Sequence, residues 1–467
     1  MPLHRSLTLR DLIVYGLLFI GPLAPVGVFG VLDARTYGAT ALTYLLATVA
    51  MAFTAWSYAQ MSGVVPHAGS VFAYATAGIG PSAGFLAGWL AMLDYLLIPS
   101  VAYLFSGIAL HALVPSVPAW IFTVAAFVVT TALNLAGVRV AARVGLYVLV
   151  AELAVLGLFV VMSVATLAVI GPARPWLSPM AGLDGLDATI VVGALSVAVM
   201  SFLGFDAIAS FAEESAGSPG QVGRAILVCL GVAGTLFVLQ TWLASLLSPI
   251  TPADLAARPD RQATAFYDIT RMALAPWLAT VLSATRAVGP AFAAMTAQAA
   301  AARLLFGMAR EGRLPRALAR VDGRHGVPRT ALATAASLTL GVSVWAARRT
   351  DGLELLVSIV DVGALAAFTL LHASVVGYFV VRRYGAARAA HVAIPVVGGL
   401  VTSWVIVEAS AVAQVVGAAW TAAGLVVLAT RGHERGPLTA PPRQASVTAH
   451  APDPPAPRPP GTRAGRR

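Results

Sequence analysis

Long apolar segments separated by short polar ones follow one another along nearly the whole chain of 467 residues. A helix needs about 20 apolar residues to cross the ~30 Å hydrocarbon layer of a membrane. The pattern therefore predicts an all-α, polytopic membrane protein with twelve spans. Their approximate ranges are 11–34, 39–62, 83–112, 118–138, 145–170, 187–213, 223–248, 275–308, 329–347, 355–381, 391–409 and 411–429.

Two of the predicted spans are interrupted near the middle. Residues 21–25 read Gly-Pro-Leu-Ala-Pro, in which each proline lacks an amide donor and restricts the residue before it. The sixth span contains Gly204 close to Asp206. Irregular backbone inside a membrane is tolerated only where it lines a cavity or is buried in protein. We therefore predict that the two interruptions face each other across one central cavity.

The interruptions also predict the domain organisation. Spans one and six are five apart, so two five-span repeats would cross the membrane in opposite directions, as in many secondary transporters. The predicted domains are a cytoplasmic N-terminus (1–10), a transporter domain (11–430) and a disordered Pro/Arg-rich cytoplasmic tail (431–467). Within the transporter domain we expect a first repeat (11–170), an inverted second repeat (187–381) and two additional spans (391–429).

Arginine is concentrated in the loops after the even-numbered spans, whereas the odd-numbered loops carry charges of both signs. Cytoplasmic loops accumulate positive charge, so we expect a multi-pass protein of the cell membrane with both termini in the cytoplasm. The net charge of +10 then reflects topology and the tail, not a nucleic-acid partner. The loop arginines are Arg139, Arg143, Arg224, Arg310, Arg313, Arg316, Arg320, Arg324, Arg382, Arg383 and Arg388.

Composition excludes several other classes of protein. A chain that is 58% hydrophobic and 11% charged does not match a soluble globular protein. The single cysteine, Cys229, excludes an internal disulfide and a cysteine metal cluster. Only His111 and His372 lie in or near spans, without metal-ligand spacing, so we expect no metal, no cofactor and no intramembrane enzyme. The first span is too long for the apolar core of a cleavable signal peptide.

Four motifs resemble signatures of the amino acid–polyamine–organocation superfamily. They are "PHAGSVFAYA" (66–75), "NLAGVRVAARV" (134–144), "GFDAIASFAEES" (204–215) and "RLLFGMAREGRLP" (303–315). The resemblance covers about residues 10–430 and implies the leucine-transporter-like fold, with ten spans in a 5+5 inverted repeat plus two more. It also implies secondary transport of amino acids or related amines by alternating access. The segment "WLAMLDYLLIP" (89–99) looks more like the putrescine-importer branch.

One departure from the family pattern bears on the substrate. Amino-acid members usually have a Gly-Ser-Gly-type break in the first span, whose free amides hold the substrate carboxylate. Here Pro22 and Pro25 remove two amides, which weakens the case for an ordinary α-amino acid. We expect import of an amine, polyamine or amino acid. The alternatives are an exchanger of amino acids or carboxylates, and a channel or non-transporting sensor of the same fold.

Ionisable groups inside the spans are functional candidates, because placing them in hydrocarbon costs at least ~2.5–3.5 kcal/mol. Asp206 is expected to bind the substrate's amino group, with Phe205 packing over it as a thin gate; a structural pair is the alternative. Asp94 either contacts substrate or forms a packing pair. Glu152 lies where some proton-coupled family members have a lysine in place of a sodium ion. We expect it to carry the coupling proton, with pairing to an arginine as the alternative and sodium as the other candidate ion. Glu408, outside the ten-span core, is expected to be structural or to lie at an interface.

Arg286, about eleven residues into the eighth span, leaves two alternatives open. As a fixed internal cation it would neutralise Asp206 or Glu152, which favours an amine substrate. As a ligand for a substrate carboxylate it would favour an amino acid or another carboxylate. The candidate substrate-binding residues are therefore Gly21, Pro22, Leu23, Ala24, Pro25, Asp94, Ser201, Gly204, Phe205, Asp206 and Arg286, with Glu152 as the ion-coupling residue.

Overall fold

The computed structural model describes residues 5–183, 188–218, 220–322, 327–349, 352–409 and 411–431. Apart from an isolated bridge between Leu7 and Ser215, this part of the chain contains no β-structure. Within these ranges, eleven helices are long and apolar enough to cross a membrane, and the fourth predicted span is an apolar helix of 17 residues. The predicted fold class is thus confirmed. The predicted tail lies outside the described residues from 432 onwards.

The helical segments occupy the twelve predicted spans in order, the first, sixth and tenth in more than one segment, and short helices connect them. The first group comprises α1 (Leu9–Ile20), η1 (Ala24–Gly27), α2 (Phe29–Arg35), α3 (Thr40–Val64), α4 (Val71–Gly78), α5 (Pro81–Leu113), α6 (Ala119–Leu135), α7 (Val138–Val169) and α8 (Ser178–Ala181). The second comprises α9 (Ala188–Met200), η2 (Phe205–Glu214), α10 (Gly220–Leu247), α11 (Pro252–Ala257), η3 (Pro259–Arg261), α12 (Ala265–Ile269), η4 (Thr270–Leu274), α13 (Pro276–Arg310), η5 (Arg316–Ala319), α14 (Arg329–Ala347), α15 (Gly352–Val375) and η6 (Val376–Val381). The last two are α16 (Ala390–Val407) and α17 (Ala411–Arg431).

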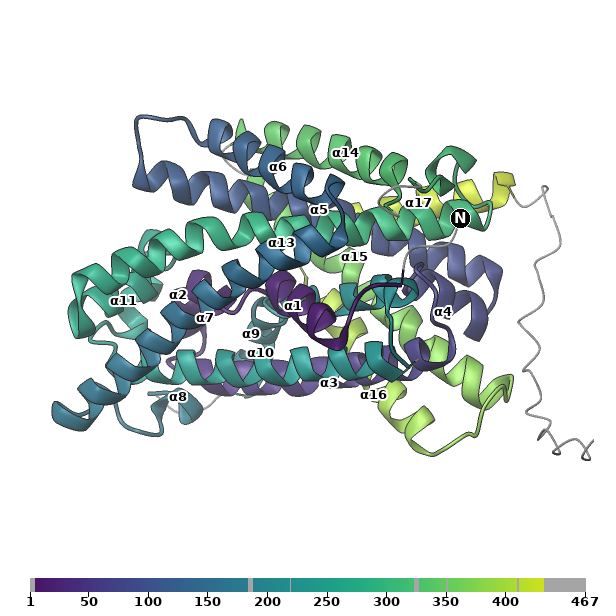
Figure 1. Cartoon of the computed structure of the whole chain (residues 1–467). Helices are drawn as coiled ribbons and strands as arrows, with labels where there is room; N and C mark the ends of the chain where they lie inside the picture. Colours follow the sequence, from purple (N-terminus) through teal and green to yellow (C-terminus); the bar gives the residue numbers. More distant parts are fainter. Residues whose placement is uncertain are drawn as a thin grey trace, which may run out of the picture. The chain divides into compact units, whose positions relative to one another are not determined.

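Helix α1 lies in the interior of the bundle, where α7, α10, α13 and η2 pack around it (Figure 1). Eight of its residues are buried, including Tyr15 and Phe19. The long helices α5 and α13 pack against each other, and α15 also packs against α5. The interrupted first and sixth spans are therefore enclosed by the helices that the sequence assigns to a transporter core.

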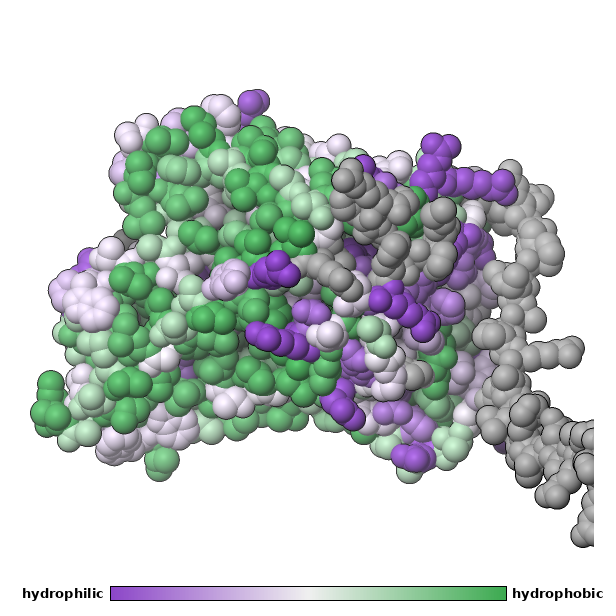
Figure 2. All heavy atoms as spheres, viewed as in Figure 1, coloured by the Kyte–Doolittle hydropathy of each residue, from purple (hydrophilic) through white to green (hydrophobic). Residues whose placement is uncertain are grey.

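The outer faces of several helices are apolar and exposed. Val161 on α7 and Val415 on α17 are 66% and 68% exposed, although both are hydrophobic. Figure 2 shows an apolar surface over much of the visible face, with hydrophilic side chains gathered toward the end where the N-terminus lies. Exposed apolar surface of this extent is typical of helices that contact lipid.

A buried arginine joins the loop after α7 to the ends of two other elements. Arg174 donates two hydrogen bonds of 2.8 Å to the carboxylate of Asp33 on α2, and both side chains are buried. It also donates to the hydroxyls of Ser245 and Ser248 and to the carbonyl of Ile250, near the end of α10. The arrangement satisfies both charges, as a buried ion pair requires.

Candidate functional site

The first span is interrupted between α1 and α2, as the two prolines predict. Gly21 follows α1 with a φ of 75°, a left-handed conformation that glycine adopts without steric cost. The chain then forms the 3-10 turn η1 and resumes as α2. The carbonyl of Pro22 accepts a hydrogen bond of 3.0 Å from Nε2 of Gln240 on α10. A neighbouring side chain thus satisfies part of the backbone that the interruption frees.

The sixth span is interrupted between α9 and η2, around Gly204, whose φ is 117°. After this glycine the chain continues as a ten-residue 3-10 helix, an unusual length for that conformation. A Cβ atom at Gly204 would lie 2.7 Å from the ring of Phe19 on α1. The second interruption therefore packs against Phe19, two residues before Gly21, while the central cavity expected between the two interruptions stays a prediction.

Asp206 lies in the first turn of η2 and is buried. Its Oδ2 accepts a hydrogen bond of 2.6 Å from the hydroxyl of Tyr95, and its Oδ1 accepts one of 3.2 Å from the amide of Gly204. Asp94, one residue before Tyr95 on α5, is also buried, and its Oδ1 has no hydrogen-bond partner. Asp94 interacts electrostatically with Asp206 and with Asp361 on α15. Three carboxylates thus come together beside the second interruption.

Aromatic rings cover this carboxylate group. Phe205, which directly precedes Asp206, is fully buried. Its ring centroid lies 6.2 Å from that of Tyr58 on α3 and 6.0 Å from that of Phe368 on α15. The Tyr58 and Phe368 centroids are 5.8 Å apart, so the three rings contact one another. Ser201, another predicted site residue, lies in the turn before Gly204 and shares a hydrogen bond of 2.9 Å with the hydroxyl of Tyr44.

Arg286 and Glu152 form a second polar group beside the first interruption. A Cβ atom at Gly27 would lie 3.0 Å from Nη2 of Arg286, so the guanidinium reaches η1. Arg286 interacts electrostatically with Glu152 and with Tyr44. Glu152 is buried on α7, and its Oε1 lies so close to Gly289 on α13 that a Cβ there would overlap it. Among the described residues no ion pair joins Arg286 to Glu152 or to Asp206, so which of the two it neutralises stays a prediction.

Two of the sequence motifs meet in an ion-pair cluster at the far end of η2. Nε of Arg303 donates a hydrogen bond of 2.5 Å to Glu214, and its guanidinium lies 4.1 Å from the ring centroid of Phe211. Arg310 pairs with Glu213. The 3-10 helix that carries Asp206 is therefore held to α13 by two arginines, which single-sequence reasoning did not pair with their acids.

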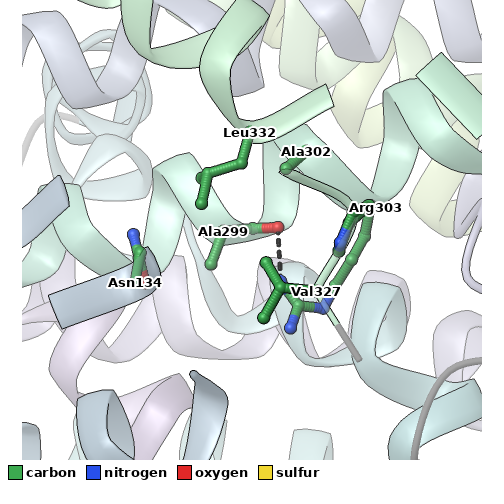
Figure 3. A pocket seen from close by; sticks show the side chains of 7 residues that line it. Asn134, Ala299, Ala302, Arg303, Val327 and Leu332 are labelled. Carbon is green, nitrogen blue, oxygen red and sulfur yellow. Dashed lines mark hydrogen bonds between the residues drawn. The ribbon is translucent and has the colours of Figure 1, made fainter. Parts of the chain in front are cut away.

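The other two motifs contact the same region. The amide of Ala68 donates a hydrogen bond of 3.0 Å to Glu213, and Asn134 donates to the carbonyl of Met295 on α13. A small pocket lies beside Arg303, which donates a hydrogen bond to the carbonyl of Ala299 (Figure 3). It is lined by Asn134, Ala299, Ala302, Arg303, Val327, Pro328 and Leu332. None of these residues is a predicted substrate ligand, so this pocket is distinct from the carboxylate group.

Asp361 is the site residue that the sequence reasoning missed. It lies inside the tenth predicted span, and the rule that selected Asp94 and Asp206 applies to it equally. Glu408, in contrast, lies just beyond the end of α16 and is exposed, outside the buried polar groups. Among the described residues, no group of three His, Cys, Asp or Glu side chains is arranged to hold a metal ion.

Comparison with known proteins identifies the family. Residues 12–430 match the amino acid permease family. The chain is 30% identical over 444 residues to the low-affinity putrescine importer PlaP of Escherichia coli K12, covering 91% of this chain and 93% of that protein. It is 26% identical to the branched-chain amino acid permease BcaP of Bacillus subtilis over 402 residues, covering 80% and 81%. A methylthioribose transporter of the same species is also 26% identical, over 401 residues.

Proposed function

The chain belongs to the amino acid permease family, and we propose that it imports an organic amine whose ammonium group binds at Asp206. Family membership makes it a multi-pass membrane transporter of amino acids or amines and not an enzyme. The proposal adds the direction of transport, alternating access and the identity of the binding residue. The domain limits and cytoplasmic termini expected from the sequence belong to the same proposal.

The observation that carries the proposal is the environment of the Asp206 carboxylate. Its hydrogen bonds come from neutral donors, and the nearby carboxylate of Asp94 has an unpartnered oxygen. No ion pair within the described part of the chain involves either side chain. A buried carboxylate without a cation is costly, and a bound ammonium would supply the missing charge. A substrate carboxylate would meet like charges instead.

Arg286 supports the same assignment by its location. Its guanidinium lies beside Gly27 and interacts electrostatically with Glu152, and among the described residues it forms no ion pair with Asp206. The prolines at 22 and 25 leave few amides with which the first interruption could hold a carboxylate. We therefore favour an amine over a carboxylate substrate, and we assign coupling to a proton carried by Glu152.

The test is a titration of purified protein with butylamine, putrescine and leucine. Losing one partner of a buried charge pair costs ~2–5 kcal/mol, and 1.4 kcal/mol is tenfold in affinity. Asp206→Asn should therefore weaken amine binding at least tenfold. Glu408→Gln, which removes an exposed carboxylate, is the matched control and should bind like the wild type. If Arg286→Ala alone abolishes binding and Asp206→Asn has no effect, the substrate is a carboxylate and the proposal is wrong.

A further inference from the structure

Asp361 approaches the carboxylate group from a third helix. Helices α5 and α15 are in close contact here, because a Cβ atom at Gly363 would lie 3.1 Å from the amide nitrogen of Asp94. The Oδ1 atoms of Asp94 and Asp361 are both buried and both lack a hydrogen-bond partner. Asp94 interacts electrostatically with both Asp206 and Asp361. The anionic region therefore extends from η2 across α5 to α15.

A buried hydroxyl without a partner lies at the same place. Tyr74 on α4 is fully buried, and its hydroxyl has no hydrogen-bond partner. Its ring centroid lies 6.0 Å from that of Tyr58, whose hydroxyl interacts electrostatically with Tyr74, Asp206 and Asp94. Unsatisfied polar groups are rare in protein interiors, so several in one place form a site that a ligand, an ion or water could satisfy. The Tyr74 hydroxyl is an acceptor available to an ammonium group.

An aromatic cluster lies at the Asp206 end of the anionic region. Phe205 adjoins Asp206, Phe368 lies two turns along α15 from Asp361, and Tyr58 contacts both rings. Aromatic faces attract ammonium groups, and they also pack against alkyl chains. An ammonium group bound at Asp206 would have these rings beside it.

We propose that Asp361 and Asp94 form a second cation-binding centre, which holds the far amino group of a linear diamine bound through its other amino group at Asp206. The inference rests on the proposed function and adds a specificity-determining residue; the class of amine follows the putrescine importer to which the chain is similar. A monoamine would fill only the Asp206 centre and leave the Asp361 centre without a cation. A diamine would supply positive charge at both ends, so the site should prefer it.

The experiment compares 1,4-diaminobutane (putrescine) with butylamine, which has the same carbon chain and one amino group. Binding to purified protein is measured for the wild type, Asp361→Asn, Asp206→Asn and the control Glu408→Gln. We expect Asp361→Asn to weaken diaminobutane binding at least tenfold and to change butylamine binding less than twofold. Asp206→Asn should weaken both ligands, and the control should match the wild type. Size-exclusion profiles and thermal unfolding show whether each variant is folded.

A second variant keeps the negative charge at position 361 and changes only the length of the side chain. Asp361→Glu moves the carboxylate further into the site by one methylene, so its preference should shift from 1,4-diaminobutane toward 1,3-diaminopropane. This variant also decides the question if Asp361→Asn does not fold. Unchanged length preference would overturn the inference.

The outcomes separate this inference from the proposed function. If Asp206→Asn weakens both amines but Asp361→Asn affects neither, or affects both equally, the second centre is wrong and the proposed function stands. If the wild type binds neither amine, both are wrong.

Discussion

At the scale of single residues, Glu152 and Arg286 combine two properties that suit ion coupling. Glu152 is buried on α7, and its Oε2 has no hydrogen-bond partner. Arg286 is a permanent cation that interacts with it and also contacts η1 of the interrupted first span. A proton arriving at Glu152 would remove its attraction for Arg286, next to a segment whose backbone is already irregular. Proton uptake and rearrangement of the first span would then be linked.

Glu152→Gln should abolish concentrative uptake of the amine in proteoliposomes and preserve exchange of labelled for unlabelled amine. The amide fills the same volume but cannot bind and release a proton. Uptake is measured under an imposed proton gradient and, separately, under a sodium gradient. The wild type should respond to the proton gradient only, and Glu408→Gln should behave like the wild type. Unchanged pH-driven accumulation in Glu152→Gln would exclude the coupling role.

Arg174→Ala should strongly destabilise the protein, because it leaves the carboxylate of Asp33 buried without a cation. Breaking a buried ion pair in this way costs about 3–5 kcal/mol. Stability is measured by chemical unfolding in detergent. Arg258→Ala is the control, since Arg258 pairs with Asp254 at 3.7 Å with both side chains about half exposed. We expect Arg258→Ala to change the stability of the protein little. Equal losses of stability in the two variants would contradict this interpretation.

At the scale of elements, the two interruptions were predictable because proline and glycine act locally. Pro22 and Pro25 remove amides whatever surrounds them, and Gly204 permits a left-handed turn. The contact between Phe19 and Gly204 was not predictable in detail, since it depends on how α1 and η2 pack. The same holds for the pairs Arg303–Glu214 and Arg310–Glu213, whose members lie about 90 residues or more apart in sequence.

Gly204→Ala should destabilise the protein more than Gly21→Ala. Both glycines have positive φ, and forcing alanine into a left-handed conformation costs about 1–2 kcal/mol. At Gly21 no atom lies within 4 Å of the added Cβ, whereas at Gly204 the Cβ would also overlap the ring of Phe19. Thermal unfolding of the two variants measures the difference. Equal losses of thermal stability in the two variants would show that the Phe19 ring moves aside without an energetic cost.

At the scale of the whole molecule, the number and order of the spans followed from hydropathy, because lipid allows little besides apolar helices. Apart from the short fourth span, each predicted range corresponds to a helix, or an interrupted helix, long enough to cross the membrane. The candidate site could be predicted from the sequence less completely. Asp206 and Asp94 were identified as charges inside spans, but their association with Asp361, Tyr58 and Tyr74 requires the packing of four helices and η2. The periodicity of one sequence does not contain that information.

The arginine distribution makes one further prediction about the whole molecule, namely that the loops after even-numbered spans are cytoplasmic. It can be tested by cysteine labelling, because the only natural cysteine, Cys229, is buried. Ala317 lies in the arginine-rich loop after α13 and Ala256 on the loop helix α11, and both are exposed. In intact cells a membrane-impermeant maleimide should label Ala256→Cys and not Ala317→Cys. After permeabilisation it should label both, and the reverse pattern in intact cells would place the termini outside.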